Sequence, residues 1–166
     1  MNLAGFNSAD ADTARAALAL CCVSERWIDG VIAGRPYATL EALKQHSDRI
    51  WRELGESDFL QAFEGHPKIG DVSSLRKKYA ASEALAAGEQ SSVAAASDDV
   101  IERLAAGNAR YEKRFGFIFI VCATGKSAAE MLTLLEERLH NDRATELAIA
   151  AEEQRRILTL RLEKML

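Results

Sequence analysis

Apolar side chains recur three and four positions apart along most of this chain, and that spacing places them on one face of an α-helix. The pattern is clearest after Ser97, Asp98 and Asp99, which mark a helix start. The stripe that follows consists of Ile101, Leu104, Tyr111 and Phe115, with the amide of Asn108 among them. We expect this amide to bond a nearby backbone group. Stripes of this kind pack against other helices, so the sequence predicts an all-α fold, a single-domain multi-helix bundle.

Capping residues and glycines set the expected ends of the helices. Ser8 is the expected N-cap of the first helix, Gly34 stops the second ahead of Pro36, and Ser127 and Glu130 form a capping box. Residues 80–96 are rich in alanine and serine and fit either a helix–loop–helix or a partly mobile flap. Helices are predicted over residues 8–22, 24–33, 39–54, 57–64, 73–79, 97–115, 127–140 and 142–164.

One segment departs from the helical pattern. Residues 117–122, Phe-Ile-Phe-Ile-Val-Cys, have the composition of a β-strand. A single strand in an otherwise helical chain has no partner to pair with. We therefore predict a short, buried, extended connector, whose free backbone groups are available to a ligand or to a neighbouring subunit.

Length and charge limit the function classes. A chain of 166 residues with 48% hydrophobic and 28% charged residues is typical of one ordinary globular domain, here residues 1–166. The net charge of −4 offers no basic excess for nucleic acid. The sequence shows neither a signal peptide nor an apolar stretch long enough to cross a membrane, so a cytoplasmic protein without a membrane partner is predicted.

The three cysteines, Cys21, Cys22 and Cys122, lack the spacing of a metal site and leave an odd number for disulfides. We expect buried, reduced thiols, with no metal and no disulfide.

The run from His66 to Gly70, His-Pro-Lys-Ile-Gly, is the first candidate for chemistry. Pro67 pushes the residue before it out of the α region, so His66 is held extended and its imidazole has a defined direction. Gly70 permits a sharp exit. The same run also fits a helix stop followed by a turn, and these residues alone do not separate the two interpretations.

Arg161 is the second candidate. It lies on or beside the inward face of the last predicted helix, and a buried guanidinium needs an anionic partner. An internal carboxylate is the simpler partner, and a substrate carboxylate is the alternative. Glu89 and Gln90 alone resemble a solvated surface, but together with His66 and Arg161 they suit proton transfer on a small polar anion without a cofactor. The other residues of the inward face are Leu147, Ala151, Gln154, Leu158 and Met165.

Several longer motifs lie along the chain and together are distinctive: Cys22-x-Ser24-x-x-Trp27, Arg35-Pro36-Tyr37, Ala62-Phe63-x-x-His66-Pro67-Lys68-Ile69-Gly70, Glu89-Gln90, Asn108-x-x-Tyr111, Lys113-Arg114-Phe115-Gly116-Phe117-Ile118-Phe119, Arg138-Leu139-x-Asn141, Glu146 and Ile157-x-x-Leu160-Arg161-Leu162. The His-Pro-x-Ile-Gly run followed by Phe-Gly-Phe is the most distinctive part. Through these motifs, and over nearly its whole length, the sequence resembles the family of 2-oxo-4-hydroxy-4-carboxy-5-ureidoimidazoline (OHCU) decarboxylases, which act late in urate breakdown and release (S)-allantoin.

The resemblance implies a cofactor-free decarboxylase that is a homodimer. It makes His66 the catalytic imidazole, Glu89 the catalytic carboxylate and Arg161 the substrate-binding arginine. Further substrate-binding positions are Pro67, Gln90, Phe117, Ile118, Phe119 and Ile120. The family commonly has a serine three residues before the glutamate, where this chain has Ala86, which offers no hydroxyl to a substrate. This departure and the Ala/Ser-rich stretch beside Glu89 leave open the alternative of a catalytically impaired helical interaction module on the same scaffold. The retention of His66, Glu89, Gln90 and Arg161 argues against that alternative.

Overall fold

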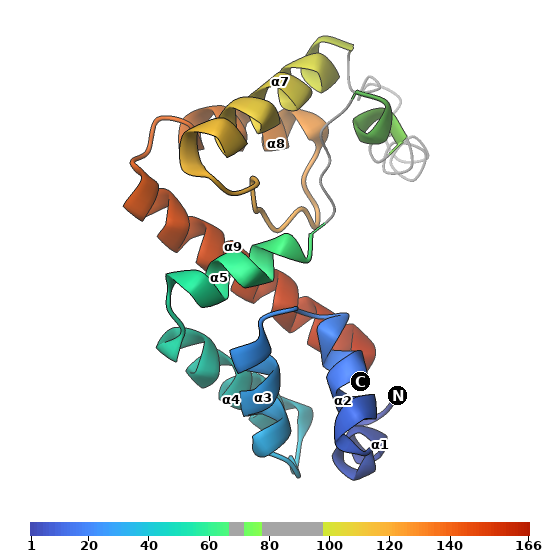
Figure 1. The fold of residues 1–166 in the computed structure, drawn as a ribbon. Coiled ribbons are helices and arrows are strands. Elements are labelled where there is room, and N and C mark those ends of the chain that lie inside the picture. Colours follow the sequence, from blue (N-terminus) through green and yellow to red (C-terminus); the bar gives the residue numbers. More distant parts are fainter. Residues whose placement is uncertain (67–71, 78–97) are drawn as a thin grey trace. The chain divides into compact units, whose positions relative to one another are not determined.

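The computed structural model of this chain describes residues 1–66, 72–77 and 98–166, and within them it contains helices and no strand (Figure 1). The all-α prediction is confirmed. Residues 72–77 are also helical. The remaining helices are α1 (Leu3–Ser8), α2 (Ala11–Ala19), α3 (Glu25–Ala33), α4 (Leu40–Glu53), α5 (Glu56–Glu64), α7 (Asp98–Phe115), α8 (Ala128–Arg138) and α9 (Arg143–Met165).

The chain divides into two compact units, one of residues Met1–His66 with Ile149–Leu166 and one of residues Pro67–Ala148. The prediction of one domain over residues 1–166 stays a prediction. None of the helices in the described ranges is long and apolar enough to cross a membrane. The expected helix–loop–helix or flap over residues 80–96 lies outside the described residues.

The first unit is built from α1–α5 and the C-terminal part of α9, with α3 packed on α2, α4 and α5. The boundary predicted for the first helix is wrong, because residues 8–22 do not form one helix. Ser8 ends α1, and its hydroxyl donates back to the carbonyl of Ala4 at 3.0 Å. Asp10 caps α2 instead, accepting from the backbone N–H of Thr13 at 2.7 Å. A carboxylate is the stronger acceptor at a helix N-terminus, which explains the shift of two residues. The core of this unit includes Phe6, Leu18, Trp27, Val31, Leu43, Trp51, Leu158 and Leu162.

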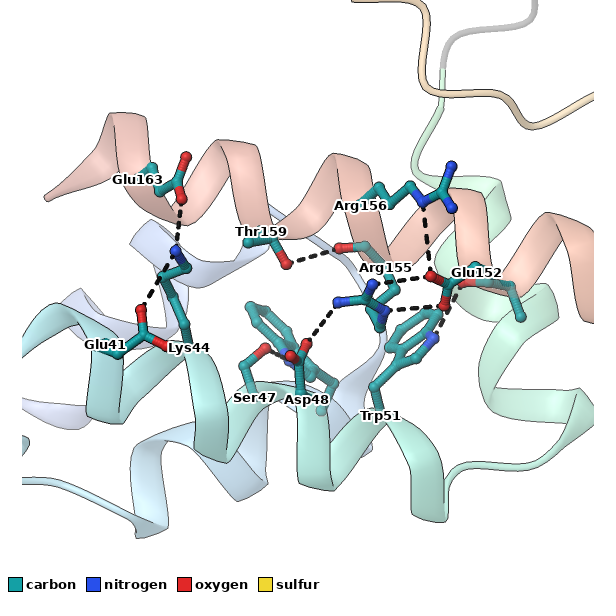
Figure 2. Close-up of polar contacts among 12 residues, drawn as sticks. Glu41, Lys44, Ser47, Asp48, Trp51, Glu152, Arg155, Arg156, Thr159 and Glu163 are labelled. Carbon is teal, nitrogen blue, oxygen red and sulfur yellow. Dashed lines mark hydrogen bonds and ion pairs between the residues drawn. The ribbon is translucent and has the colours of Figure 1, made fainter.

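Polar contacts fix α4 against α9, as Figure 2 shows. Lys44 pairs with Glu163 at 2.7 Å, and Arg155 pairs with Asp48 at 3.1 Å, two turns earlier on α9. The buried indole of Trp51 donates to a backbone carbonyl of α9 at 3.1 Å. Exposed ion pairs contribute little stability, but three contacts spread along two helices define the rotation of α9. That rotation decides which α9 side chains point inward.

The second unit is organised around the pair α7 and α8. Gly107 lies where the two helices approach closely, since a Cβ atom built there would be 2.6 Å from Leu135 of α8. Ser127 caps α8 as predicted, because its hydroxyl accepts from the backbone N–H of Glu130 at 3.1 Å. The carboxylate of Glu130 accepts from the same hydroxyl at 3.3 Å, in place of the backbone bond of a full capping box. Asn108 is half-buried. The buried face of the pair consists of Ile101, Leu104, Tyr111, Phe115, Met131, Leu132 and Leu135.

The segment with strand composition is an irregular connector between α7 and α8, as predicted. Phe117 and Ile120 are buried, whereas Ile118 and Phe119 are half-buried. One expectation for this segment needs correction. The carbonyl of Ile120 is not free for a ligand, because it accepts a hydrogen bond from the guanidinium of Arg138 at 2.7 Å.

Candidate active site

His66 lies directly after the C-terminus of α5. Its backbone N–H donates to the carbonyl of Phe63 at 3.1 Å, so the helical turn continues up to this residue. The end of α5 is fixed to the segment before α3. A Cβ atom at Gly65 would be 2.8 Å from Val23, and the side-chain oxygen of Gln61 accepts from the N–H of Glu25 at 3.0 Å. The predicted helix stop is therefore present, whereas the turn expected to follow it, over residues 67–70, lies outside the described residues.

The imidazole of His66 contacts a side chain that is 88 positions away in the sequence. Its Nε2 atom lies within hydrogen-bond distance of the side-chain oxygen of Gln154, which is on α9 and has no exposed surface. Burial lowers the pKa of His66 below its usual value near 6.5. The bond to Gln154 acts in the opposite direction, and the positive charge of Arg161 lowers the pKa further. The imidazole is therefore neutral at neutral pH and able to accept a proton.

Arg161 lies seven residues after Gln154 on α9, which places it two turns along the same helix face, about 10 Å away. Its guanidinium is half-buried and donates to the carbonyl of Cys21 at 3.1 Å. No carboxylate within the described ranges pairs with it. The internal carboxylate expected from the sequence is thus not found there, and the fork of the guanidinium has donors left for an anion.

Two buried thiols lie beside this arginine. Burial raises the pKa of both Cys21 and Cys22 to about 11, against a small opposing effect of Arg161. They are therefore uncharged at neutral pH and do not serve as anionic partners of Arg161. Cys122, expected to be buried, is only half-buried, and all three thiols are free.

In the second unit a buried polar cluster holds the connector. Arg138 forms an ion pair with Glu146, and the hydroxyl of Tyr111 donates to the same carboxylate. Burial, and then the hydrogen bond to Glu146, raise the pKa of Tyr111 far above its usual value, so the phenol stays a neutral donor. Asn141 donates to the second oxygen of Glu146 at 3.1 Å. Since Arg138 also binds the carbonyl of Ile120, this cluster determines where the connector runs.

The structure accounts for part of the predicted site. His66 and Arg161 lie in the first unit. Phe117, Ile118, Phe119 and Ile120 lie on the connector of the second unit. Pro67, Glu89 and Gln90, with Ala86, lie outside the described residues. Sequence reasoning placed Gln154 on the inward stripe but gave it no role, although a polar residue among apolar ones on a buried helix face is a signal. It also gave no role to the cluster of Arg138 and Glu146.

The fold and these residues define a helical protein in which a neutral histidine contacts α9. On the same face of α9, an arginine has no carboxylate partner among the residues that the structure describes. The family model for OHCU decarboxylases matches residues 7–163. The chain belongs to the OHCU decarboxylase family.

Curated relatives agree with this assignment. The chain is 35% identical over 146 residues to the "Uric acid degradation bifunctional protein TTL" of Arabidopsis thaliana, covering 88% of this chain and 45% of that protein. It is 28% identical to the "Uric acid degradation bifunctional protein" of a Bacillus species, covering 79% of this chain and 25% of that protein. The chain thus spans less than half the length of these two relatives. An OHCU decarboxylase of Haloferax volcanii is 25% identical over 78% of this chain and 74% of its own length.

Two solved structures share the fold. An OHCU decarboxylase crystallised in the presence of (S)-allantoin is 34% identical, with a TM-score of 0.69 over 87% of this chain and 93% of that one. An (S)-allantoin synthase superposes with a TM-score of 0.73 over all of this chain and 54% of its own. At 16% identity that second likeness concerns the fold alone.

Proposed function

We propose that this protein is a cofactor-independent decarboxylase that converts OHCU to (S)-allantoin in urate degradation. One observation carries the proposal: the same face of α9 holds Gln154, which contacts the neutral imidazole of His66, and Arg161. The guanidinium of Arg161 lacks a carboxylate partner within the described ranges. Membership of the OHCU decarboxylase family supports it. The relatives named for this reaction supply the substrate class.

The chemistry fits these side chains. The substrate is a carbinol acid next to an imine carbon. The bond between the carbinol carbon and the carboxylate breaks, its electron pair moves into the conjugated imine, whose nitrogen takes up a proton, and CO₂ leaves. In the resulting enol-like intermediate the hydroxyl gives up its proton and becomes a carbonyl. The former imine carbon takes up a proton on one face, which gives a single enantiomer. Such a site has to bind the carboxylate, orient the hydroxyl and hold one group in position to transfer the proton.

Each residue has a proposed role. Arg161 anchors an anionic or carbonyl edge of the substrate, because its fork offers two parallel donors. His66 and Glu89 handle the hydroxyl and the transferred proton, which agrees with the lowered pKa of His66. By the family resemblance, Pro67, Gln90 and residues 117–120 line the pocket. We also propose, on the same ground, a single domain, a homodimer and a cytoplasmic location.

The test is the stereochemistry of the product. Freshly oxidised urate contains OHCU, whose slow spontaneous decay gives racemic allantoin. Adding the purified protein should produce an excess of (S)-allantoin, detected by circular dichroism, at a rate proportional to protein concentration. A racemic product formed at the rate of the buffer control would contradict the proposal. That result would favour the helical interaction module that Ala86 suggests.

A further inference from the structure

Gln154 is polar, fully buried and only partly bonded. It has no exposed surface, and its neighbours on the inward face of α9, Ala151 and Leu158, are apolar. Its side-chain oxygen contacts Nε2 of His66, but its buried side-chain nitrogen has no acceptor among the residues that the structure describes. A buried amide with an unpaired nitrogen costs stability compared with an apolar side chain of the same volume. The contacts among the described residues therefore give no stability reason for a glutamine here.

The contact with His66 defines a hydrogen position. A carboxamide oxygen only accepts hydrogen bonds, so Nε2 of His66 has to donate. A neutral imidazole carries a hydrogen on only one of its two nitrogens, so a hydrogen on Nε2 leaves Nδ1 with a free lone pair. We propose that Gln154 is a positioning residue that holds His66 in the Nε2–H tautomer and so presents Nδ1 as the proton-accepting atom. The catalytic meaning of this inference rests on the proposed function.

A neutral amide suits this task better than a carboxylate would. A carboxylate at the same position would hold the tautomer equally well, but it would also stabilise the charged imidazolium. It would in addition be available to pair with Arg161 on the same face of α9. The amide orients the ring without adding charge, so the imidazole stays neutral and the arginine stays free for an anion. The charged group acting on His66 within the described ranges is Arg161.

The tautomer can be observed directly by ¹⁵N nuclear magnetic resonance of the histidine side chains. The chain has three histidines, and His46 provides an internal control. The hydroxyl of Tyr37 donates to the carbonyl of Val31 at 2.6 Å, so Nδ1 of His46, 2.7 Å from the hydroxyl oxygen, has to be the donor in that contact. We expect a protonated Nε2 for His66 and a protonated Nδ1 for His46. A protonated Nδ1 at His66 in the wild type would overturn the proposal.

Two substitutions separate positioning from packing. Gln154→Met keeps the volume and removes the acceptor. We expect a mixture of His66 tautomers, a kcat lower by about tenfold or more with a smaller change in KM, and an unchanged or higher melting temperature. Gln154→Glu keeps the acceptor and adds charge. We expect the Nε2–H tautomer to persist and the acidic limb of the pH–rate profile to move to higher pH.

The control is Gln45→Met, which changes an exposed glutamine on α4 and should leave tautomer, kcat and melting temperature unchanged. Gln154→Met with an unaltered tautomer and unaltered kcat would overturn the proposal, even if it melted at a lower temperature. The resonance measurement needs no substrate. A wild type that is inactive on OHCU yet shows the expected tautomer, lost in Gln154→Met, would therefore contradict the proposed function and support the positioning role.

Discussion

Replacing Arg161 with methionine should abolish substrate use and leave the fold intact. Within residues 1–66, 72–77 and 98–166, the guanidinium makes one hydrogen bond, to the carbonyl of Cys21 at 3.1 Å, and it is half-exposed. Water can replace that bond, so the free energy of unfolding should change by about 1 kcal/mol or less. For a chain of this length that is a shift in melting temperature of about 4 °C at most. If the guanidinium holds a substrate carboxylate by two charge-assisted hydrogen bonds, the substitution removes about 3–6 kcal/mol of binding free energy. The expected fall in kcat/KM is about 10²–10⁴-fold.

Arg138 provides the matched control, because it is the buried arginine of an ion pair. Arg138→Met leaves the fully buried carboxylate of Glu146 without its cation and frees the carbonyl of Ile120. Breaking a buried pair from one side typically costs about 3–5 kcal/mol. The expected loss in melting temperature is about 6–20 °C. The same chemical change thus has opposite consequences at the two arginines.

Thermal melts without ligand, measured beside kcat/KM for (S)-allantoin formation, decide between the two arginine roles. We expect Arg161→Met to melt close to the wild type and to be nearly inactive. Suppose instead that it melts as low as Arg138→Met and keeps a kcat/KM within threefold of the wild type. Arg161 would then be a structural residue with an internal partner, and the reasoning from its unpaired guanidinium would be wrong.

Three further predictions concern His66 and the thiols. His66→Asn should keep its circular dichroism spectrum but lose about 3 kcal/mol of barrier lowering or more, a hundredfold or greater fall in kcat; near-normal turnover would remove the histidine from the mechanism. Because the folded-state pKa of His66 is lowered, the unfolded chain binds the extra proton first, so stability should fall as pH drops from about 7 through 6.5 and level off below the folded-state pKa. Urea denaturation across that range should show the fall in the wild type and a smaller one in His66→Asn; equal slopes would contradict it. Activity should survive exhaustive dialysis against a chelator, since Cys21, Cys22 and Cys122 lack ligand spacing; a loss of activity that added metal restores would show that the protein has a metal site.

The helices could be predicted from the sequence because their signals are local. The apolar stripe of α7, the N-cap at Ser127 and the stop at Gly34 each depend on residues within one or two turns. The one clear error, a continuous helix from Ser8, is also local. Ser8 and Asp10 both cap helices well, and spacing alone does not show that the carboxylate at Asp10 captures the N–H of Thr13. Helix boundaries of this kind depend on competition between neighbouring caps.

The site is harder to predict because its contacts are long-range. Asn108 and Gln154 look alike in the sequence, each an amide on an apolar helical stripe. In the structure Asn108 is half-buried on α7, whereas Gln154 is fully buried against His66. Nothing within a turn of either residue distinguishes them. The difference arises from the orientation of α9, which is fixed by its contacts with α4 (Figure 2) between pairs of residues 100 or more positions apart.

The connector shows how a strand-like sequence is used without a sheet. Its apolar side chains, Phe117 and Ile120, anchor it in the core of the second unit, but burial leaves backbone groups that need partners. Arg138 supplies one, and Glu146 offsets the charge that this brings inside. A buried ion pair is weak support for stability in itself. The ion pair instead determines the path of the chain between α7 and α8, because the guanidinium of Arg138 bonds both a carboxylate and a backbone carbonyl of the connector. Segment composition therefore predicted the burial of Phe117 and Ile120 correctly, but not the half-exposure of the other residues of the segment or the bonded state of the Ile120 carbonyl.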